Sequence, residues 1–452
     1  MSQPAQAVET QTRAEPIPRA VAFAFWLKLG FISFGGPAGQ IAIMHSELVQ
    51  RRRWISERRF LHALNYCMLL PGPEAQQLAT YLGWLMHRTA GGLAAGLLFV
   101  LPSLLILIVL SSIYIAFGDR PLVAGLFYGI KPAVVAIVLH AAWRIGSRTL
   151  HNAWLWVIAV AAFAALFAFD APFPLIVLAA ALIGMAGGRW APEKFSTAAA
   201  HAGTTATRVA AVIDDDTPTP PHARFSRARL LRVLATGLAL WGVALGALVL
   251  GFGWTGLLTQ MGWFFTKAAL LTFGGAYAVL PYVYQAAVEH YGWLTGPQMI
   301  AGLALGETTP GPLIMVVAFV GFVGGWQAPM FGAEHLLLAG VAAALIVTFF
   351  TFLPSFIFIF AGAPLIESTH GDLRFTAPLT AITAAVVGVI VNLALFFAGH
   401  VFWPQGPSAA IDWIAVALAA AAALVLFRFK IGVIPVIAAC ALAGLVIASV
   451  MR

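Results

Sequence analysis

The sequence predicts an all-α polytopic membrane protein built from two homologous halves in inverted topology. Three observations support this class: an apolar composition, motifs that recur at a constant spacing, and the distribution of Lys and Arg between apolar segments. Of the 452 residues, 61% are hydrophobic and only 9% are charged, whereas about a quarter of the residues of soluble domains are charged. An ordinary soluble domain, a disordered chain and a collagen-like fibre are therefore excluded.

The net charge of +8 does not indicate a nucleic-acid partner, because the basic residues lie in short loops between apolar runs, as the positive-inside rule expects. Residues 1–17 form a polar N-terminal tail that lacks the pattern of a cleavable signal peptide. Cys67 and Cys440 lie in separate apolar segments. We therefore expect no disulfide framework, no metal site and no cofactor.

An internal repeat is the main feature of the chain. Residues 25–37 read FWLKLGFISFGGP and residues 264–276 read FFTKAALLTFGGA, an offset of 239 that also places one PGP triplet over the other. Farther along, two LPS triplets are related by an offset of 252, which indicates an insertion in the second half near residues 327–339. These spacings predict a first repeat over 18–188 and a second, inverted repeat over 256–452.

The segment between the repeats has a different composition. Residues 189–229 contain three successive Asp, then the sequence TPTPP, then Arg224, Arg227 and Arg229, which is typical of a disordered, solvated linker. One apolar run over 230–252 then has no counterpart before the first repeat. We expect it to be an extra transmembrane helix that starts the second half on the opposite side of the membrane.

In each half the first two apolar segments are interrupted. The segments are 18–48, 60–86, 258–288 and 298–326, with FGGP, LPGPEAQ, FGGA and TPGP as the interruptions. Such Gly and Pro breaks leave backbone groups unpaired and are tolerated in membranes only inside protein or along a wet cavity. They predict broken spans or re-entrant hairpins, each pair followed by about four transmembrane helices. In the first half these helices are expected over 92–117, 121–143, 153–169 and 172–188.

Loop charges favour the re-entrant alternative. With re-entrant hairpins, the basic residues of the first half and the linker fall on one side, which is then cytoplasmic, as is the N-terminus. No Lys or Arg occurs between Lys267 and Arg374, as expected if the second half is inverted.

The breaks also predict an anion site. A helix that begins inside the membrane directs unpaired N–H groups and a partial positive charge at its ligand. Lys28 and Lys267 would add positive charge at equivalent depths, and Ser33, Thr272, Gln76 and Gln77 could donate hydrogen bonds. The predicted substrate-binding residues are Lys28, Ser33, Gly35, Gly36, Pro37, Pro71, Gly72, Pro73, Glu74, Gln76, Lys267, Thr272, Gly274, Gly275, Pro310, Gly311 and Pro312.

Each of these assignments has a structural alternative. The Gly and Pro motifs could be packing kinks, and the lysines could snorkel or pair with an acid. Glu74 and Glu307 are candidates for carrying a coupled proton, or for pairing with Lys28 or Lys267. Walker A, HExxH and GxSxG motifs are missing from the sequence, so no enzyme activity is expected.

The motifs FWLKLGFISFGGP, LPGPEAQQLATYLGW, FGGA, TPGPL and the LPS triplets resemble the chromate transporter (CHR) superfamily in its long, two-domain form. The resemblance implies a secondary transporter that exports chromate, an analogue of sulfate, and confers chromate resistance, driven by the membrane potential or a proton gradient. The second half departs from the pattern at Ala276 and Leu313, where the first half has Pro37 and Glu74. One half would then bind the anion while the other supports it.

These observations together predict a multi-pass protein of a bacterial inner (cytoplasmic) membrane, with chromate or a similar oxyanion and the lipid bilayer as partners. A homodimer is one candidate assembly. A carrier of sulfate or another oxyanion and an anion channel remain alternatives within transport. A membrane-embedded enzyme or an assembly scaffold is the alternative outside it.

Overall fold

The computed structural model describes residues 17–34, 36–195, 211–215, 217, 220–368, 376–406 and 408–450. Within these ranges the elements are helices, and the β-structure is limited to an isolated bridge between Ile55 and Ile213. Seven helices are long and apolar enough to cross a membrane, and three shorter apolar segments accompany them. The predicted all-α polytopic class is confirmed.

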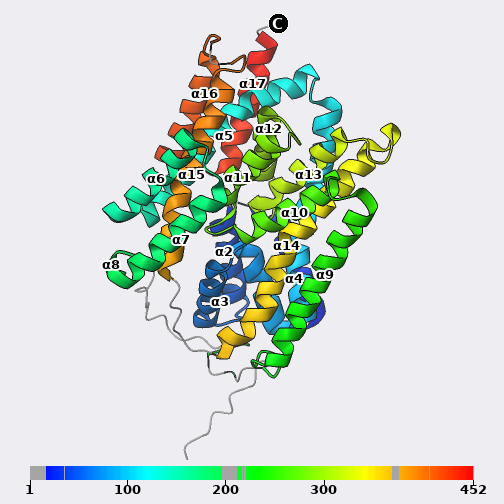
Figure 1. The fold of residues 1–452 in the computed structure, drawn as a ribbon, viewed down its shortest axis with the longest axis vertical. Coiled ribbons are helices and arrows are strands. Elements are labelled where there is room, and N and C mark those ends of the chain that lie inside the picture. The colour runs from blue at the N-terminus through cyan, green and yellow to red at the C-terminus, as the bar shows by residue number, and fades with distance from the viewer. Residues whose placement is uncertain are drawn as a thin grey trace, which may run out of the picture.

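The first half begins with two short, broken segments and continues with longer helices (Figure 1). Its elements are α1 (Arg19–Ile32), α2 (Gly36–His45), the π-helix η1 (Ser46–Arg51), α3 (Glu57–Leu69), α4 (Glu74–Phe117), α5 (Pro121–Thr149), α6 (Ala153–Phe169), α7 (Phe173–Trp190) and the short α8 (Pro192–Phe195). The backbone of α4 leaves helical geometry at His87 and Arg88, where Arg88 has φ 58°. A short arm that begins at Glu74 and a long helix that ends at Phe117 therefore meet at this kink.

The second half repeats this order after one additional helix, α9 (Arg227–Phe252), at the position of the expected extra helix. Its elements are α10 (Leu257–Leu270), α11 (Ala276–Tyr284), the π-helix η3 (Gln285–His290), α12 (Gly296–Thr308), η4 (Leu313–Met315), α13 (Val316–Gln327), η5 (Ala333–His335), α14 (Leu336–Ser368), α15 (Thr376–Phe402), α16 (Trp413–Leu424), the π-helix η6 (Val425–Phe429) and α17 (Val433–Val450). The 3₁₀ turn η5 lies in the expected insertion.

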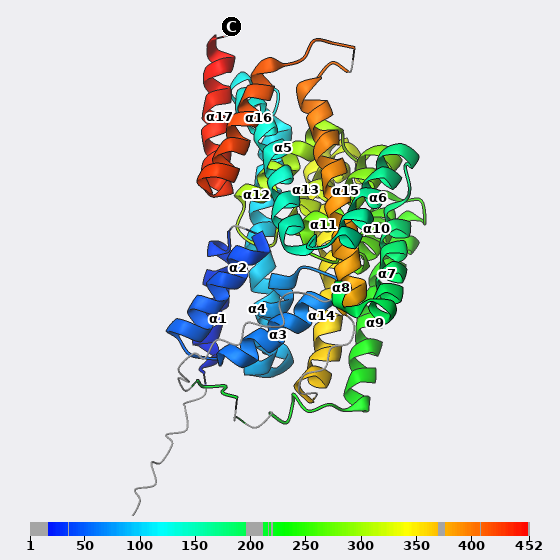
Figure 2. The ribbon, with the colours of Figure 1, turned by 90° about the vertical axis from the view of Figure 1, so that its left-hand side faces the viewer.

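The broken segments of the first half fold back on themselves. Nε2 of His87, at the kink in α4, lies 2.8 Å from the carbonyl oxygen of Ile17, just before α1. The amide of Val212 donates to the carbonyl of Arg53, between the two hairpins. Nε2 of His222 lies 3.1 Å from the carbonyl oxygen of Trp84, near the end of the second broken segment. The ends of both broken segments therefore lie beside residues 211–215 and 220–224, which we call the linker end of the molecule. Figure 2 shows α1–α3 toward this end and α11–α13 above them along the long axis.

Reciprocal hydrogen bonds join the two halves. The amide of Gly72 donates to the carbonyl of Thr272 over 2.7 Å, and the amide of Gly311 donates to the carbonyl of Ser33 over 2.8 Å. Because both the donors and the acceptors are related by the offset of 239, this is the contact pattern of a two-fold pair. The two π-helices η1 and η3 follow the same offset. The two-repeat organisation is thereby confirmed.

Part of the segment expected to be a disordered linker has a defined structure. The amide of Ile213 donates to the carbonyl of Trp54, and the amide of Ser56 donates to the carbonyl of Ile213, each over 3.0 Å. The Ser56 hydroxyl donates to Asp215 over 2.6 Å. The expectation of disorder is wrong for residues 211–215, because Ile213 buries its side chain here, leaving 9% of the residue exposed. Residues 196–210 lie outside the described ranges.

Candidate functional site

A cavity of about 650 Å³ lies where the two halves meet. Its walls come from α2, α3, the start of α4 and α5 of the first half, and from the start of α11 of the second half. Gln50 and Glu57 of the first-half hairpins also line it, so the cavity extends from the breaks toward the linker end of the molecule.

Two helices that come from different halves begin at this cavity. Pro37 and Ala38 in the first turn of α2, and Ala276 and Tyr277 in the first turn of α11, contribute to its lining. The first N–H groups of a helix have no partner within the helix and carry a partial positive charge. Both helix starts therefore direct a partial positive charge into the space between them.

Glycine is required at these starts by the backbone. Gly36 has φ +71° and Gly275 has φ +95°, values in the left-handed region, where a side chain is strained. The chain reverses direction at both positions, and any other residue would resist the turn. Gly274, which also lines the cavity, has φ +78°. The GG motif is thus explained in the second half, while Gly35 of the first half lies outside the described residues.

Arg144 of α5 brings a full positive charge to the same place. It lines the large cavity and also a small neighbouring cavity of about 20 Å³. A β-carbon on Gly36 would lie 4.0 Å from Nη2 of Arg144. Among the residues that the structure describes, no carboxylate lies within ion-pair distance of this guanidinium. A guanidinium beside two helix N-termini is an arrangement suited to an oxyanion.

The small cavity contains an acid that is hydrogen-bonded to a tyrosine. Tyr277 donates its hydroxyl to the Glu307 carboxylate, and both residues share this cavity with Arg144 and His140. Arg144 therefore stands between an open cavity on one side and a half-buried carboxylate on the other.

Ser33 and Thr272 act through their backbone. Their carbonyl oxygens accept the reciprocal hydrogen bonds from Gly311 and Gly72, and the Thr272 hydroxyl donates to the carbonyl of Ala268 within its own helix. Both residues are fully buried and neither lines either cavity. The structure thus uses the two residues to join the breaks and does not bring their hydroxyls to the cavity.

The two PGP turns pack against the LPS motif of the opposite half. A β-carbon on Gly72 would lie 2.4 Å from Oγ of Ser355, and one on Gly311 would lie 2.8 Å from Cβ of Ser103. The triplets Pro71–Pro73 and Pro310–Pro312 are therefore packed between the halves, and neither lines the cavity.

Only part of the predicted polar set reaches the cavity. Glu74, the first residue of α4, lines it, so three of the four expected helix starts meet there. The fourth, at Leu313, is 4% exposed and buried in apolar packing. Gln76 donates to the Thr80 hydroxyl over 3.0 Å and Gln77 donates to the carbonyl of Pro71 over 2.8 Å, which fixes both side chains within the protein.

The two lysines do not lie beside the breaks, contrary to the prediction. Lys28 is exposed on the outer face of α1, together with Leu27 and Phe31. The Lys267 ammonium lies over the ring of Trp263, 5.8 Å from its centroid. Neither lysine lines a cavity described above. The two lysines occupy equivalent positions of the repeats, but a position on the opposite face of a helix turns the charge away from the site.

Sequence reasoning missed Arg144 because it ended the apolar segment 121–143 one residue before it. The helix α5 continues to Thr149, which places Arg144 more than a turn inside it. The apolar residues Ile145 and Leu150 continue the segment and were the available signal. Gln40 was also missed: its amide donates to the carbonyls of Ser33 and Gly311, and so ties the first break to the opposite PGP turn.

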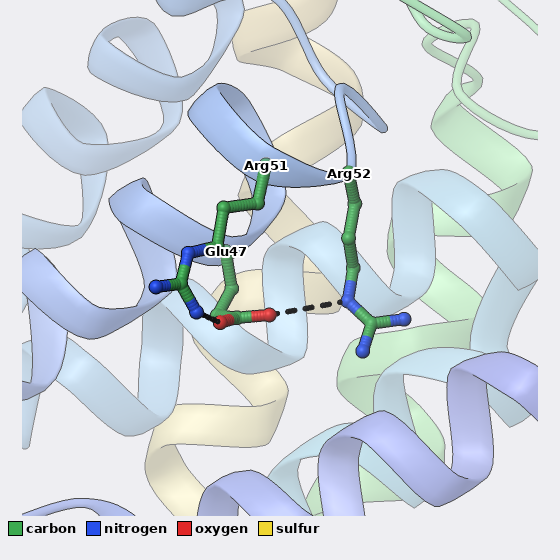
Figure 3. A network of polar contacts seen from close by, with 3 residues as sticks. All are labelled: Glu47, Arg51 and Arg52. Atoms are coloured by element: carbon green, nitrogen blue, oxygen red, sulfur yellow. Dashed lines mark hydrogen bonds and ion pairs between the residues drawn. The ribbon is translucent and has the colours of Figure 1, made fainter.

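Arg51 and Arg52, in the arginine cluster after the first broken segment, hold a nearby carboxylate. The Glu47 carboxylate accepts from Arg51 over 2.8 Å and from Arg52 over 3.3 Å (Figure 3). The Arg52 guanidinium also lies 5.1 Å from the ring centroid of Phe25 and 5.0 Å from that of Trp54. Burial acts to raise the pKa of Glu47, but the hydrogen bonds and charges of the two arginines outweigh it and lower this pKa.

Comparison with known proteins agrees with this architecture. The family model for the chromate transporter matches residues 20–185 and 259–445, that is, both repeats. A chromate transport protein from Pseudomonas aeruginosa is 33% identical over 98% of this chain and 96% of its own length. A chromate transport protein from Cupriavidus metallidurans is 29% identical over 83% of this chain and 81% of its own length. No solved structure matches this chain.

The matched family consists of membrane transporters rather than enzymes. Its two matched regions coincide with the two sets of broken and long helices described above. With seven apolar helices long enough to span a bilayer, this chain is a multi-pass membrane protein and belongs to the chromate transporter family.

Proposed function

We propose that this protein is a secondary transporter that carries chromate, with the anion bound in the large cavity beside Arg144. The observation that carries the proposal is the meeting of a guanidinium with the N-termini of α2 and α11 around one space. Chromate is a tetrahedral dianion. Arg144 can offer two parallel N–H donors to two of its oxygens, while the helix starts offer backbone N–H groups.

The same proposal places the protein in a bacterial inner membrane as an inverted repeat with re-entrant hairpins. The linker end carries Arg51, Arg52 and Arg53 together with residues 211–215 and 220–224, and we assign it to the cytoplasm by the positive-inside rule. The large cavity extends toward this end, so chromate enters it from the cytoplasm and is exported. Export of chromate confers resistance to it. The membrane potential, negative inside, favours the outward movement of a dianion.

Two carboxyl groups near the anion are proposed to carry a coupled proton. Glu74 lines the large cavity, and Glu307 shares the small cavity with Arg144. A dianion at Arg144 would add negative charge close to both carboxylates, and this favours their protonation. This assignment does not require Lys28 or Lys267.

The test is a flux measurement with purified protein in liposomes. Labelled chromate, sulfate and molybdate are offered separately, with and without an imposed voltage and an imposed pH gradient. We expect saturable chromate flux that an inside-negative potential drives outward. Competition by sulfate at equal concentration would make the protein a general oxyanion carrier, and a flux that does not saturate would make it an anion channel. No flux of any of the three anions would contradict transport altogether.

A further inference from the structure

The large cavity has a counterpart in the second half, and that counterpart is nearly closed. The large cavity is lined by Ala38, Met68 and Gly275 among others. The offset of 239 relates these residues to Tyr277, Glu307 and Gly36, which line the small cavity. The small cavity, about 20 Å³ against about 650 Å³, is therefore the part of the counterpart space that stays open at these three positions, and α5 and α17 form its other wall.

Aromatic side chains fill the remainder of the counterpart space. His45 and Arg144 line the large cavity, and their equivalents are Tyr284 and Phe396. The rings of Tyr284 and Phe396 lie 4.2 Å apart between centroids, and Tyr284 is 5% exposed. Phe397, the equivalent of the cavity residue Ile145, is fully buried.

The outer end of this packing is closed by His400. Its ring lies 4.1 Å from that of Phe396 between centroids, and a β-carbon on Gly296 would lie 3.0 Å from it. The equivalent residues of the first half, Arg148 and Glu57, both line the open cavity. The start of α12 is thus in contact with α15, where α3 and α5 stand apart.

The two repeats share one backbone plan, but the first has an open cavity and the second a closed one. The structure is therefore one of two conformational states that the same fold can adopt. If each repeat adopted the present arrangement of the other, the first cavity would close and the second would open, which is the alternating access of inverted-repeat transporters. Arg144 lines both spaces. An anion held by it would therefore remain in place while access changes from one side to the other.

We infer that Tyr284, Phe396, Phe397 and His400, which we call the aromatic gate, close a second access route to the anion site from the side opposite the linker end. The inference rests on the proposed function, since it takes the anion to bind at Arg144. Opening the gate separates α11 and α12 from α15, as the large cavity separates α2 and α3 from α5.

A reversible cross-link tests the gate. Cysteines replace Tyr284 and Phe396 in a background where the buried Cys67 and Cys440 are changed to Ala, and a short thiol-reactive linker joins them. We expect chromate flux in liposomes to fall by at least about tenfold and to return on reduction, because the gate cannot open. Binding of chromate, measured in detergent, should change by less than about twofold, since the large cavity stays open. Each single-cysteine variant treated with the linker is the control.

The outcomes separate the gate from the anion site. Unchanged flux after complete cross-linking would overturn the gate. A double variant that binds no chromate before cross-linking, in a protein that folds as the parent does, would count against the anion site instead.

Matched single cysteines provide a second readout that needs no cross-link. In Ile145→Cys the thiol should react with a membrane-impermeant reagent from the linker side. In Phe397→Cys it should react from the opposite side only. Reaction of Phe397→Cys from the linker side, or from neither side during transport, would overturn the inference.

Discussion

Equivalent positions of the two repeats carry different chemistry on a common backbone. The backbones agree in detail, since Arg53 and Gly292, related by the offset of 239, have φ values of 52° and 63° and each directly follows a π-helix and one turn residue. The side chains differ. At five positions a polar or charged residue of the first half has a different residue at the equivalent position of the second half. The pairs are Gln40 and Val279, Arg52 and Tyr291, Glu74 and Leu313, Arg144 and Phe396, and Arg148 and His400.

This comparison separates the residues that determine the fold from those that determine the chemistry of the cavity. The breaks, the π-helices and the PGP turns recur in both repeats and make the fold. Except for Glu307, the charged residues that line the cavities come from the first repeat, whose cavity is open. An aromatic residue and a histidine stand at the equivalents of Arg144 and Arg148 in the second repeat, where the counterpart space is closed. Under the proposed function, the first half of this duplicated scaffold binds the anion and the second half closes the opposite access route.

The largest effect on chromate binding is expected from replacing Arg144, whose equivalent in the second half is the uncharged Phe396. Arg144→Ala removes a guanidinium whose charged hydrogen bonds contribute about 1.5–3 kcal/mol, so chromate affinity should fall by roughly 10- to 150-fold. Arg144→Lys should lose less, because it keeps the charge but not the planar pair of donors. Isothermal titration of the purified protein measures both. Arg120→Ala, at the exposed start of α5, is the control, and wild-type affinity in Arg144→Ala would remove this residue from the site.

The next effect tests the two-fold equivalence of the PGP turns. Gly72→Ala and Gly311→Ala each place a β-carbon at positive φ, 128° and 106°, and against the serine of the opposite LPS motif. Each should destabilise the protein by about 1–3 kcal/mol, seen as a lower unfolding temperature in tryptophan fluorescence. Gly242→Ala, on α9 with no atom within 4 Å of the added carbon, should be neutral or stabilising. A loss in only one of the two PGP variants would break the equivalence.

The smallest effect concerns the pair Arg52 and Tyr291. Tyr291 stacks on Trp293 with centroids 4.5 Å apart, as Arg52 lies over Trp54, so the first half alone needs a carboxylate, Glu47, to accompany the charge. Arg51 is 74% exposed, and an ion pair of this kind contributes less than about 1 kcal/mol. Glu47→Gln should therefore lower the unfolding temperature only slightly at neutral pH.

The pH dependence of this variant has a definite sign. Because the arginines lower the pKa of Glu47 from 4.5, its stabilisation is complete above that ordinary value and is lost as the pH falls through the lowered native pKa. The unfolding temperatures of the parent and of Glu47→Gln should therefore converge in acid. A difference between them that grows as the pH falls would contradict the role assigned to this carboxylate.

Much of the fold could be predicted because its signals are local. The apolar runs, the GG and PGP interruptions and the constant offset are read directly from neighbouring residues, and they gave the helical class, the duplication and the position of α9. Glu74, Pro37, Gly36, Gly274 and Gly275 were identified as site residues for the same reason and do line the two cavities.

The remaining part of the site depends on contacts between the halves. The sequence by itself determined the membrane class, the repeat and the places where helices break, since composition and local backbone preference decide these. Only the tertiary structure decided that Lys28 faces outward, that Arg144 faces the breaks, and that one of two equivalent spaces is open. The physical reason is that the rotational setting of a helix and the packing of Tyr284 on Phe396 arise from segments far apart in the chain, which no local pattern encodes.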